Sequence, residues 1–159
     1  MSTPTTDAVR KSIEVLVPVE RAWAVFTEEM STWWPLATHS IGADQGSLPD
    51  AVVVEGRAGG SIYETVGDDR REWGVVAEWE PPSRIAVDWV VGGAVATRWT
   101  ATFTPTARGT RVDLVHAGFE AHGDRAAELR EAYGSEGGWT LVLDRFAEVV
   151  NASPGRQSA

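Results

Sequence analysis

The chain of 159 residues contains no cysteine. Disulfide frameworks, thiol nucleophiles and metal sites built from thiolates are therefore excluded. Long apolar runs are missing too, because no stretch approaches the ~20 residues of a membrane helix. The N-terminus also lacks the apolar core of a signal peptide. These absences predict a cytoplasmic protein that has no disulfide bonds and does not enter a membrane.

Basic residues are scarce and form no run. Lysine and arginine together number 14 against 23 aspartates and glutamates, which gives a formal net charge of −9. Such a chain has no stripe of cations to place along a phosphate backbone or an anionic membrane surface. We therefore expect neither nucleic acid nor membranes as partners.

Common catalytic motifs are absent as well. The sequence has no G-x-S-x-G elbow, no P-loop and no G-x-G-x-x-G fingerprint. Its three histidines, His39, His116 and His122, lack the spacing of a metal-binding pair such as H-E-x-x-H. We expect no cofactor and no bound metal.

Tryptophan, in contrast, is abundant. The chain has eight tryptophans against two tyrosines and four phenylalanines. Tryptophan is large and carries one N–H that needs an acceptor, so a surplus of it suits wide cores, interfaces or the walls of aromatic ligand sites. Core packing is the ordinary role, and a ligand wall is the alternative that the sequence leaves open.

The last amphipathic segment, residues 135–151, predicts a long helix that closes the fold. Its apolar positions recur every three or four residues and so share one side. They are Trp139, Val142, Leu143, Phe146, Val149 and Val150. Ser135 is the expected N-cap. The pair Gly137 and Gly138 weakens the helix start by roughly 1 kcal/mol per glycine, and would permit a close backbone approach or an opening of a cavity.

Upstream of this helix, strand and turn signals alternate. We expect a first strand at 9–17, an amphipathic helix from Val19 to Met30, a helical turn at 31–35 and a long loop at 37–50. Six strands then follow at 52–56, 60–66, 71–79, 84–90, 97–105 and 110–118, and a modest helix at 122–133. The flexible ends would be 1–8 and 152–159, so that 9–151 forms a single domain.

The turns between these strands predict one consistent antiparallel register. Pairing across them sets Glu64 near Trp73 and Val75 near Trp89. Because side chains along a strand alternate between faces, one face then collects almost all the apolar residues. This predicted inner face consists of Ile62, Glu64, Trp73, Val75, Ala77, Ile85, Val87, Trp89, Trp99, Ala101, Phe103, Val112, Leu114 and His116.

Two members of the inner face, Glu64 and His116, are ionisable. Burying a charge without a partner costs several kcal/mol, so each must be hydrogen-bonded, neutral or in contact with a ligand. One interpretation is structural: His116 donates to a backbone carbonyl, and Glu64 accepts from the indole of Trp73 or Trp99. The other is functional, with both groups orienting a polar atom of an otherwise apolar ligand. In an enzyme they would serve as acid and base.

Several stretches resemble the SRPBCC superfamily, and in particular the group named for homology to the heat-shock-protein ATPase activator. They are WGVVAEWEPPSRI at 73–85, TRVDLVHAGF at 110–119, GWTLVLDRF at 138–146, WWP at 33–35 and VLVPVERAWAVFT at 15–27. The resemblance implies an α+β, START-like helix-grip fold, in which a curved antiparallel sheet wraps the C-terminal helix and encloses a hydrophobic cavity. Members include lipid carriers, hormone receptors, polyketide cyclases and dehydratase-like enzymes, so fold analogy does not select a function.

Three functional hypotheses follow. The first is a binding protein for a small, mostly apolar and aromatic or lipid-like molecule, and the second is a cyclase- or dehydratase-like enzyme that uses His116 and Glu64. The third is a protein-interaction module resembling the ATPase activators, although we expect no chaperone partner for a stand-alone domain. A homodimer is the commonest assembly among oligomers. The predicted ligand-binding residues are Trp34, Glu64, Trp73, Trp89, Trp99, Phe103, His116, Trp139 and Leu143.

Overall fold

A computed structural model describes residues 8–35, 49–90 and 96–152. Almost all of the predicted flexible ends, 1–8 and 152–159, lie outside these ranges. Most of the predicted loop at 37–50 also lies outside them, as do residues 91–95 between two of the predicted strands.

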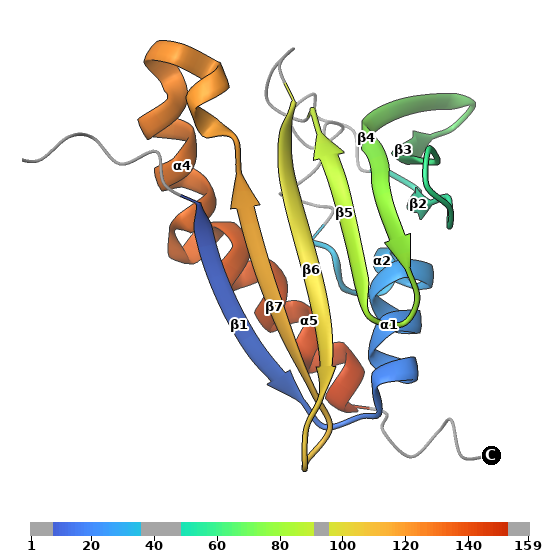
Figure 1. The fold of residues 1–159 in the computed structure, drawn as a ribbon. Coiled ribbons are helices and arrows are strands. Elements are labelled where there is room, and N and C mark those ends of the chain that lie inside the picture. Colours follow the sequence, from blue (N-terminus) through green and yellow to red (C-terminus); the bar gives the residue numbers. More distant parts are fainter. Residues whose placement is uncertain (1–7, 36–48, 91–95, 153–159) are drawn as a thin grey trace, which may run out of the picture.

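Seven antiparallel strands form a single curved sheet (Figure 1). The strands are β1 (Val9–Val15), β2 (Ala51–Val54), β3 (Ser61–Val66), β4 (Asp69–Glu80), β5 (Arg84–Trp89), β6 (Thr97–Pro105) and β7 (Thr110–Ala117). Their order is β1-β7-β6-β5-β4-β3-β2, so the chain runs as a meander from β2 to β7 and the first strand joins the far edge. All seven predicted strands are present.

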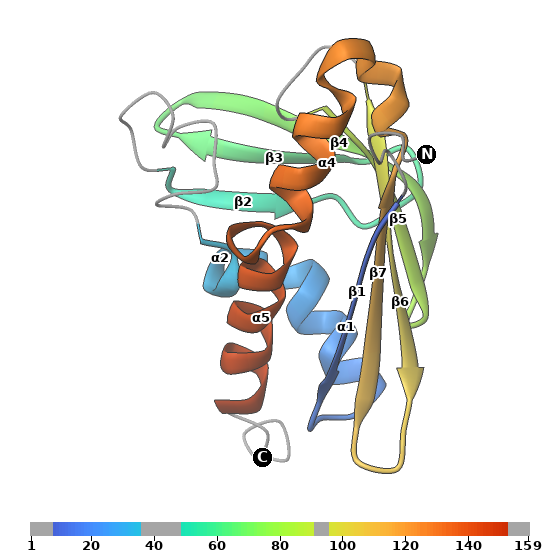
Figure 2. The same cartoon turned by 90° about the vertical axis from the view of Figure 1, so that its left-hand side faces the viewer.

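Helices cover the concave face of the sheet (Figure 2). They are α1 (Val19–Glu28), α2 (Met30–Trp33), a 3-10 segment η1 (Phe119–Arg125), α4 (Ala126–Gly134), a π-helical turn η2 (Glu136–Thr140) and α5 (Leu141–Ala152). Figure 2 shows α5 beside α1 and α2, with β2 and β3 crossing above them. This is the α+β helix-grip architecture that the resemblance implied.

The C-terminal helix begins later than the sequence predicts. Gly138 has non-helical dihedral angles (φ −94°, ψ −126°), and the regular α-helix starts at Leu141. Ser135 makes no capping bond, because its hydroxyl donates to the carbonyl of Ala132 at 2.9 Å. A Cβ at Gly138 would lie 2.3 Å from the carbonyl oxygen of Tyr133. Glycine is therefore required here for a close backbone approach, which is one of the two roles expected for the glycine pair.

The register of β4 also differs from the prediction. Glu64 lies opposite Arg71, and the pairing is irregular next to Ile62. A second irregularity between Val76 and Glu78 changes the pairing with β5. These β-bulges reverse the faces locally, so Val75 is 46% exposed and does not belong to the inner face. Ala77, another predicted member, is only partly buried.

The other twelve residues of the predicted inner face are buried. The apolar residues among them share one core with buried side chains of α1 and α5, and Phe26 of α1 belongs to this core. Its ring centroid is 5.3 Å from those of both Phe103 and Phe146. The outer face is polar and carries exposed ion pairs such as Arg98 with Asp88 at 2.8 Å. The alternation of apolar and polar residues along the strands therefore determines which face receives the helices.

Candidate functional site

Five tryptophans from separate elements form a closed ring of contacting indoles, here called the tryptophan cluster. They are Trp34 after α2, Trp73 on β4, Trp89 on β5, Trp99 on β6 and Trp139 in η2. Taken in that order and back to Trp34, successive ring centroids are 5.2, 5.5, 6.0, 5.5 and 5.9 Å apart. All five are buried, and the most exposed is 6% accessible. Tilted and edge-to-face contacts of this kind hold each indole in a defined orientation.

Polar side chains accept the N–H groups of the two indoles on β4 and β5. The N–H of Trp73 donates to Oε1 of Glu64 at 2.7 Å. The N–H of Trp89 donates to the hydroxyl of Tyr133 at 3.1 Å. Burial raises the pKa of Tyr133 above its usual value, so its phenol is neutral near pH 7. The hydrogen bond predicted between Trp73 and Glu64 is confirmed.

His116 orients a third indole and is fully buried. Its Nδ1 accepts the N–H of Trp139 at 2.9 Å, so in this network the ring proton is assigned to Nε2. Nε2 then donates to the hydroxyl of Thr97 at 2.7 Å. The predicted backbone carbonyl partner is therefore wrong, since both partners are side chains. Burial lowers the pKa of His116 from 6.5 to about 3, which keeps the imidazole neutral.

A small apolar cavity of about 40 Å³ adjoins the cluster. It is lined by Trp34, Trp89, Tyr133, Gly138, Trp139 and Val142. Pockets for drug-sized ligands usually enclose ~300–1,000 Å³. The cavity is therefore several times smaller than a pocket for a molecule of that size.

The predicted site residues separate into three layers around this cavity. Trp34, Trp89 and Trp139 line it. Trp73 and Trp99 belong to the cluster but do not line the cavity. Glu64 and His116 stand behind the indoles that they orient.

Two predicted ligand contacts lie elsewhere in the core. Phe103 contacts Trp23 and Phe26, with ring centroids 5.3 Å away in both cases. Leu143 is buried on α5, but the adjacent Val142 lines the cavity in its place. Both residues lie on the apolar faces predicted for them, and those faces extend well beyond the cavity.

Tyr133 and Val142 were not predicted as site residues. Both occupied apolar positions of predicted helices, so a signal for burial was present. Their convergence on one cavity depends on the interruption at Gly138, which joins α4 to α5 through a backbone contact. Helical periodicity does not reveal such an interruption, because it assumes a continuous helix.

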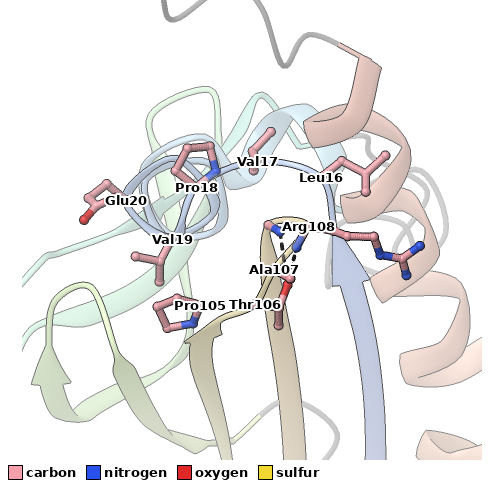
Figure 3. Close-up of a pocket in the computed structure, with 10 residues that line it drawn as sticks. Leu16, Val17, Pro18, Val19, Glu20, Pro105, Thr106, Ala107 and Arg108 are labelled. Carbon is pink, nitrogen blue, oxygen red and sulfur yellow. Dashed lines mark hydrogen bonds between the residues drawn. The ribbon is translucent and has the colours of Figure 1, made fainter.

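The surface carries a larger groove of about 490 Å³ between the segment after β1 and the β6–β7 hairpin (Figure 3). The hydroxyl of Thr106 accepts from the backbone N–H groups of Arg108 and Gly109 and holds the hairpin turn, as the dashed lines in Figure 3 show. Leu16 on the opposite wall is 55% exposed. No predicted site residue lines this groove, and we assign it no role.

Two further features bear on function. Within the described ranges, no three histidine, aspartate or glutamate side chains come together as a metal site. None of the helices in the same part of the chain is long and apolar enough to cross a membrane.

Comparisons with known proteins support the resemblance found in the sequence. No curated protein sequence matches the chain. Among solved structures, an anthrahydroquino-gamma-pyrone synthase, Txn09, is 32% identical, with 91% of this chain and 99% of that one covered and a TM-score of 0.60. CalC, a self-sacrificing resistance protein from Micromonospora echinospora, is 22% identical over 96% of this chain and 99% of that one, with a TM-score of 0.68.

A third structure, a protein from Rhodobacter sphaeroides, is 17% identical over 95% of this chain and 97% of that one, with a TM-score of 0.68. At such low identity, the last two comparisons show the shared fold alone. Residues 16–151 match the sequence model of one protein family, which is described as Activator of Hsp90 ATPase homolog 1-like protein. The chain therefore belongs to the Activator of Hsp90 ATPase homolog 1-like protein family.

Proposed function

We propose that the protein binds a planar aromatic molecule between the indoles of the tryptophan cluster, in a widened form of the cavity that adjoins it. The observation that carries this proposal is the polar support of the cluster. Glu64, Tyr133 and His116 each accept the N–H of a different indole. Aromatic walls held in fixed orientations are suited to stacking against a flat ligand.

Core packing alone does not explain why three polar side chains accept the indole N–H groups. Each buried polar group must recover the free energy that it loses on leaving water, and an apolar core would avoid that cost. A cavity bordered by three indoles and a tyrosine also offers aromatic surface against which a flat molecule can pack. A ligand that enters it would make those contacts.

The synthase relative favours an aromatic ligand. It is 32% identical over almost the whole of both chains, and its name specifies an anthrahydroquino-gamma-pyrone, which is a fused aromatic ring system. We extend to this chain the class of molecule, a flat fused-ring compound, and not the particular product.

Widening of the cavity would use the least regular parts of its wall. Trp34 directly follows α2, a helix of only four residues. Gly138 and Trp139 belong to the interrupted turn before α5. Separation of Trp34 from Trp139, whose ring centroids are 5.9 Å apart, would open the cluster without breaking a strand pair.

Filling the cavity tests this proposal. In Val142→Leu, one added methylene would occupy part of the cavity, and titration calorimetry with naphthalene should show binding at least tenfold weaker than in the wild type. Val149→Leu, on the same helix but outside the cavity lining, is the matched control and should bind like the wild type. Equal affinity in all three proteins, or no binding to any of them, would contradict the proposal.

A second candidate is a cyclase-like enzyme, which the name of the 32% identical synthase favours. His116 would be a poor acid or base, because both ring nitrogens are engaged and its pKa lies near 3. The test compares metabolites in an extract of expressing cells after incubation with the wild type and with His116→Asn. A compound that only the wild type consumes would favour catalysis, whereas unchanged profiles and a co-purifying aromatic compound would favour binding.

A further inference from the structure

One buried hydrogen-bond donor in the tryptophan cluster has no acceptor. Within residues 8–35, 49–90 and 96–152, three buried side-chain nitrogens lack a hydrogen-bond partner: Arg21 Nε, Arg71 Nη1 and Trp99 Nε1. The guanidinium of Arg21 still pairs with Glu29 through Nη1 at 3.2 Å. Trp99 differs, because Nε1 is its only polar side-chain atom and the residue is completely buried.

Trp99 lies next to the indoles that line the cavity. Trp99 does not itself line the cavity, but its ring contacts two residues that do, Trp89 and Trp139, at centroid separations of 6.0 and 5.5 Å. A widened cavity that separates these indoles would reach it. The N–H groups of those two neighbours already donate to Tyr133 and His116. Of these three adjacent indoles, Trp99 alone has an N–H without an acceptor.

An unsatisfied donor is costly, since leaving a buried N–H without an acceptor forfeits its hydration. A phenylalanine would fill much of the same space without this cost. The acceptor nitrogen of His116, the residue opposite Trp99 on β7, already receives the N–H of Trp139. The cost would be recovered in a complex whose ligand brings its own acceptor.

We propose that Trp99 Nε1–H is the specificity-determining donor of the ligand site, and that it selects planar aromatic molecules bearing a carbonyl or quinone-type oxygen over the corresponding hydrocarbons. This inference rests on the proposed function and deepens it, because it specifies the polar group that the aromatic ligand must carry. Stacking between the indoles would supply affinity, and the Trp99 hydrogen bond would supply selectivity and orientation.

A pair of probes that differ in one functional group tests the inference. Indan-1-one and indane share the same bicyclic frame, and only indan-1-one has a carbonyl oxygen. The quantity measured by calorimetry is the Kd of indane divided by the Kd of indan-1-one. We expect this ratio to fall about tenfold in Trp99→Phe, the change that one recovered hydrogen bond produces. Trp23→Phe, in the neighbouring aromatic layer, is the matched control and should keep the wild-type ratio.

Nuclear magnetic resonance gives a second readout that needs no variant. In the assigned 1H–15N spectrum of the wild type, the Trp99 indole proton should shift downfield with indan-1-one and not with indane. If Trp99→Phe fails to fold, this comparison alone is decisive. Binding of both probes with an unchanged ratio and an unmoved Trp99 resonance would overturn the inference and leave the proposed function intact. Failure of both probes to bind would overturn both.

Discussion

The buried imidazole of His116 predicts a specific dependence of stability on pH. Its pKa falls from 6.5 to about 3 on folding, because burial penalises the charged form. Between these two values the unfolded chain binds a proton at His116 and the folded protein does not. The free energy of unfolding therefore rises with pH through this window, and the contribution of His116 to the pH dependence ends above pH 6.5.

The magnitude follows from one proton. Each pH unit inside the window changes the free energy of unfolding by about 1.4 kcal/mol. Lowering the pH from about 6.5 to about 4.5 should therefore cost roughly 2 kcal/mol through His116 alone, because the unfolded imidazole is already half protonated at pH 6.5. Since stabilities of single domains are typically ~5–15 kcal/mol, this is a large loss.

His116→Asn isolates the effect. The asparagine carbonyl can take the place of Nδ1 as an acceptor for Trp139, and the side chain does not titrate. Urea unfolding, followed by tryptophan fluorescence at several pH values, would give the free energy of unfolding for both proteins. The variant is expected to be less stable at neutral pH but to lose roughly 2 kcal/mol less between pH 6.5 and 4.5. Parallel pH curves for the two proteins would refute the neutral, buried imidazole.

Three further predictions concern the walls of the site. Glu64→Leu should lower the free energy of unfolding by ~1–3 kcal/mol, because it leaves the Trp73 N–H buried without an acceptor. Glu64→Gln retains an acceptor and should lose less stability. Equal losses for the two variants in urea unfolding would argue against Glu64 as the acceptor of the Trp73 N–H. Gly138→Ala should lower the melting temperature, since its Cβ would lie 2.3 Å from the Tyr133 carbonyl oxygen, and an unchanged melting temperature would show that the close approach is not required. Val142→Leu should raise the free energy of unfolding by up to ~0.8 kcal/mol as it fills the cavity, whereas a loss of stability would mean that the cavity is too small for one methylene.

Much of the fold could be predicted because strand alternation is a local signal. Trp73, Trp89 and Trp99 were assigned to the inner face, and all three are buried. Trp73 was correctly placed although its predicted partner in the strand pairing was wrong. The bulges in β4 shift the pairing without changing the burial of Trp73, and they move Val75 outward. A bulge has no strong sequence signal, because it depends on the curvature of the whole sheet.

The candidate site was harder to predict from the sequence, because it too depends on contacts that leave no strong local signal. Thr97 became the acceptor for His116 across the β6–β7 pair, but a threonine at the start of a strand is not distinctive. Tyr133 reached the cavity through the backbone contact at Gly138. Such contacts join residues that are distant in sequence, and local patterns carry little information about them.

The most direct test of the central claim is an 1H–15N titration of the indole N–H groups with indan-1-one. The eight tryptophans give eight separate probes. Binding in the cavity predicts saturable shifts of the resonances of the three indoles that line it, Trp34, Trp89 and Trp139, and none at Trp23 on α1. Unmoved cluster resonances at saturating indan-1-one, or shifts centred on Trp23, would contradict it.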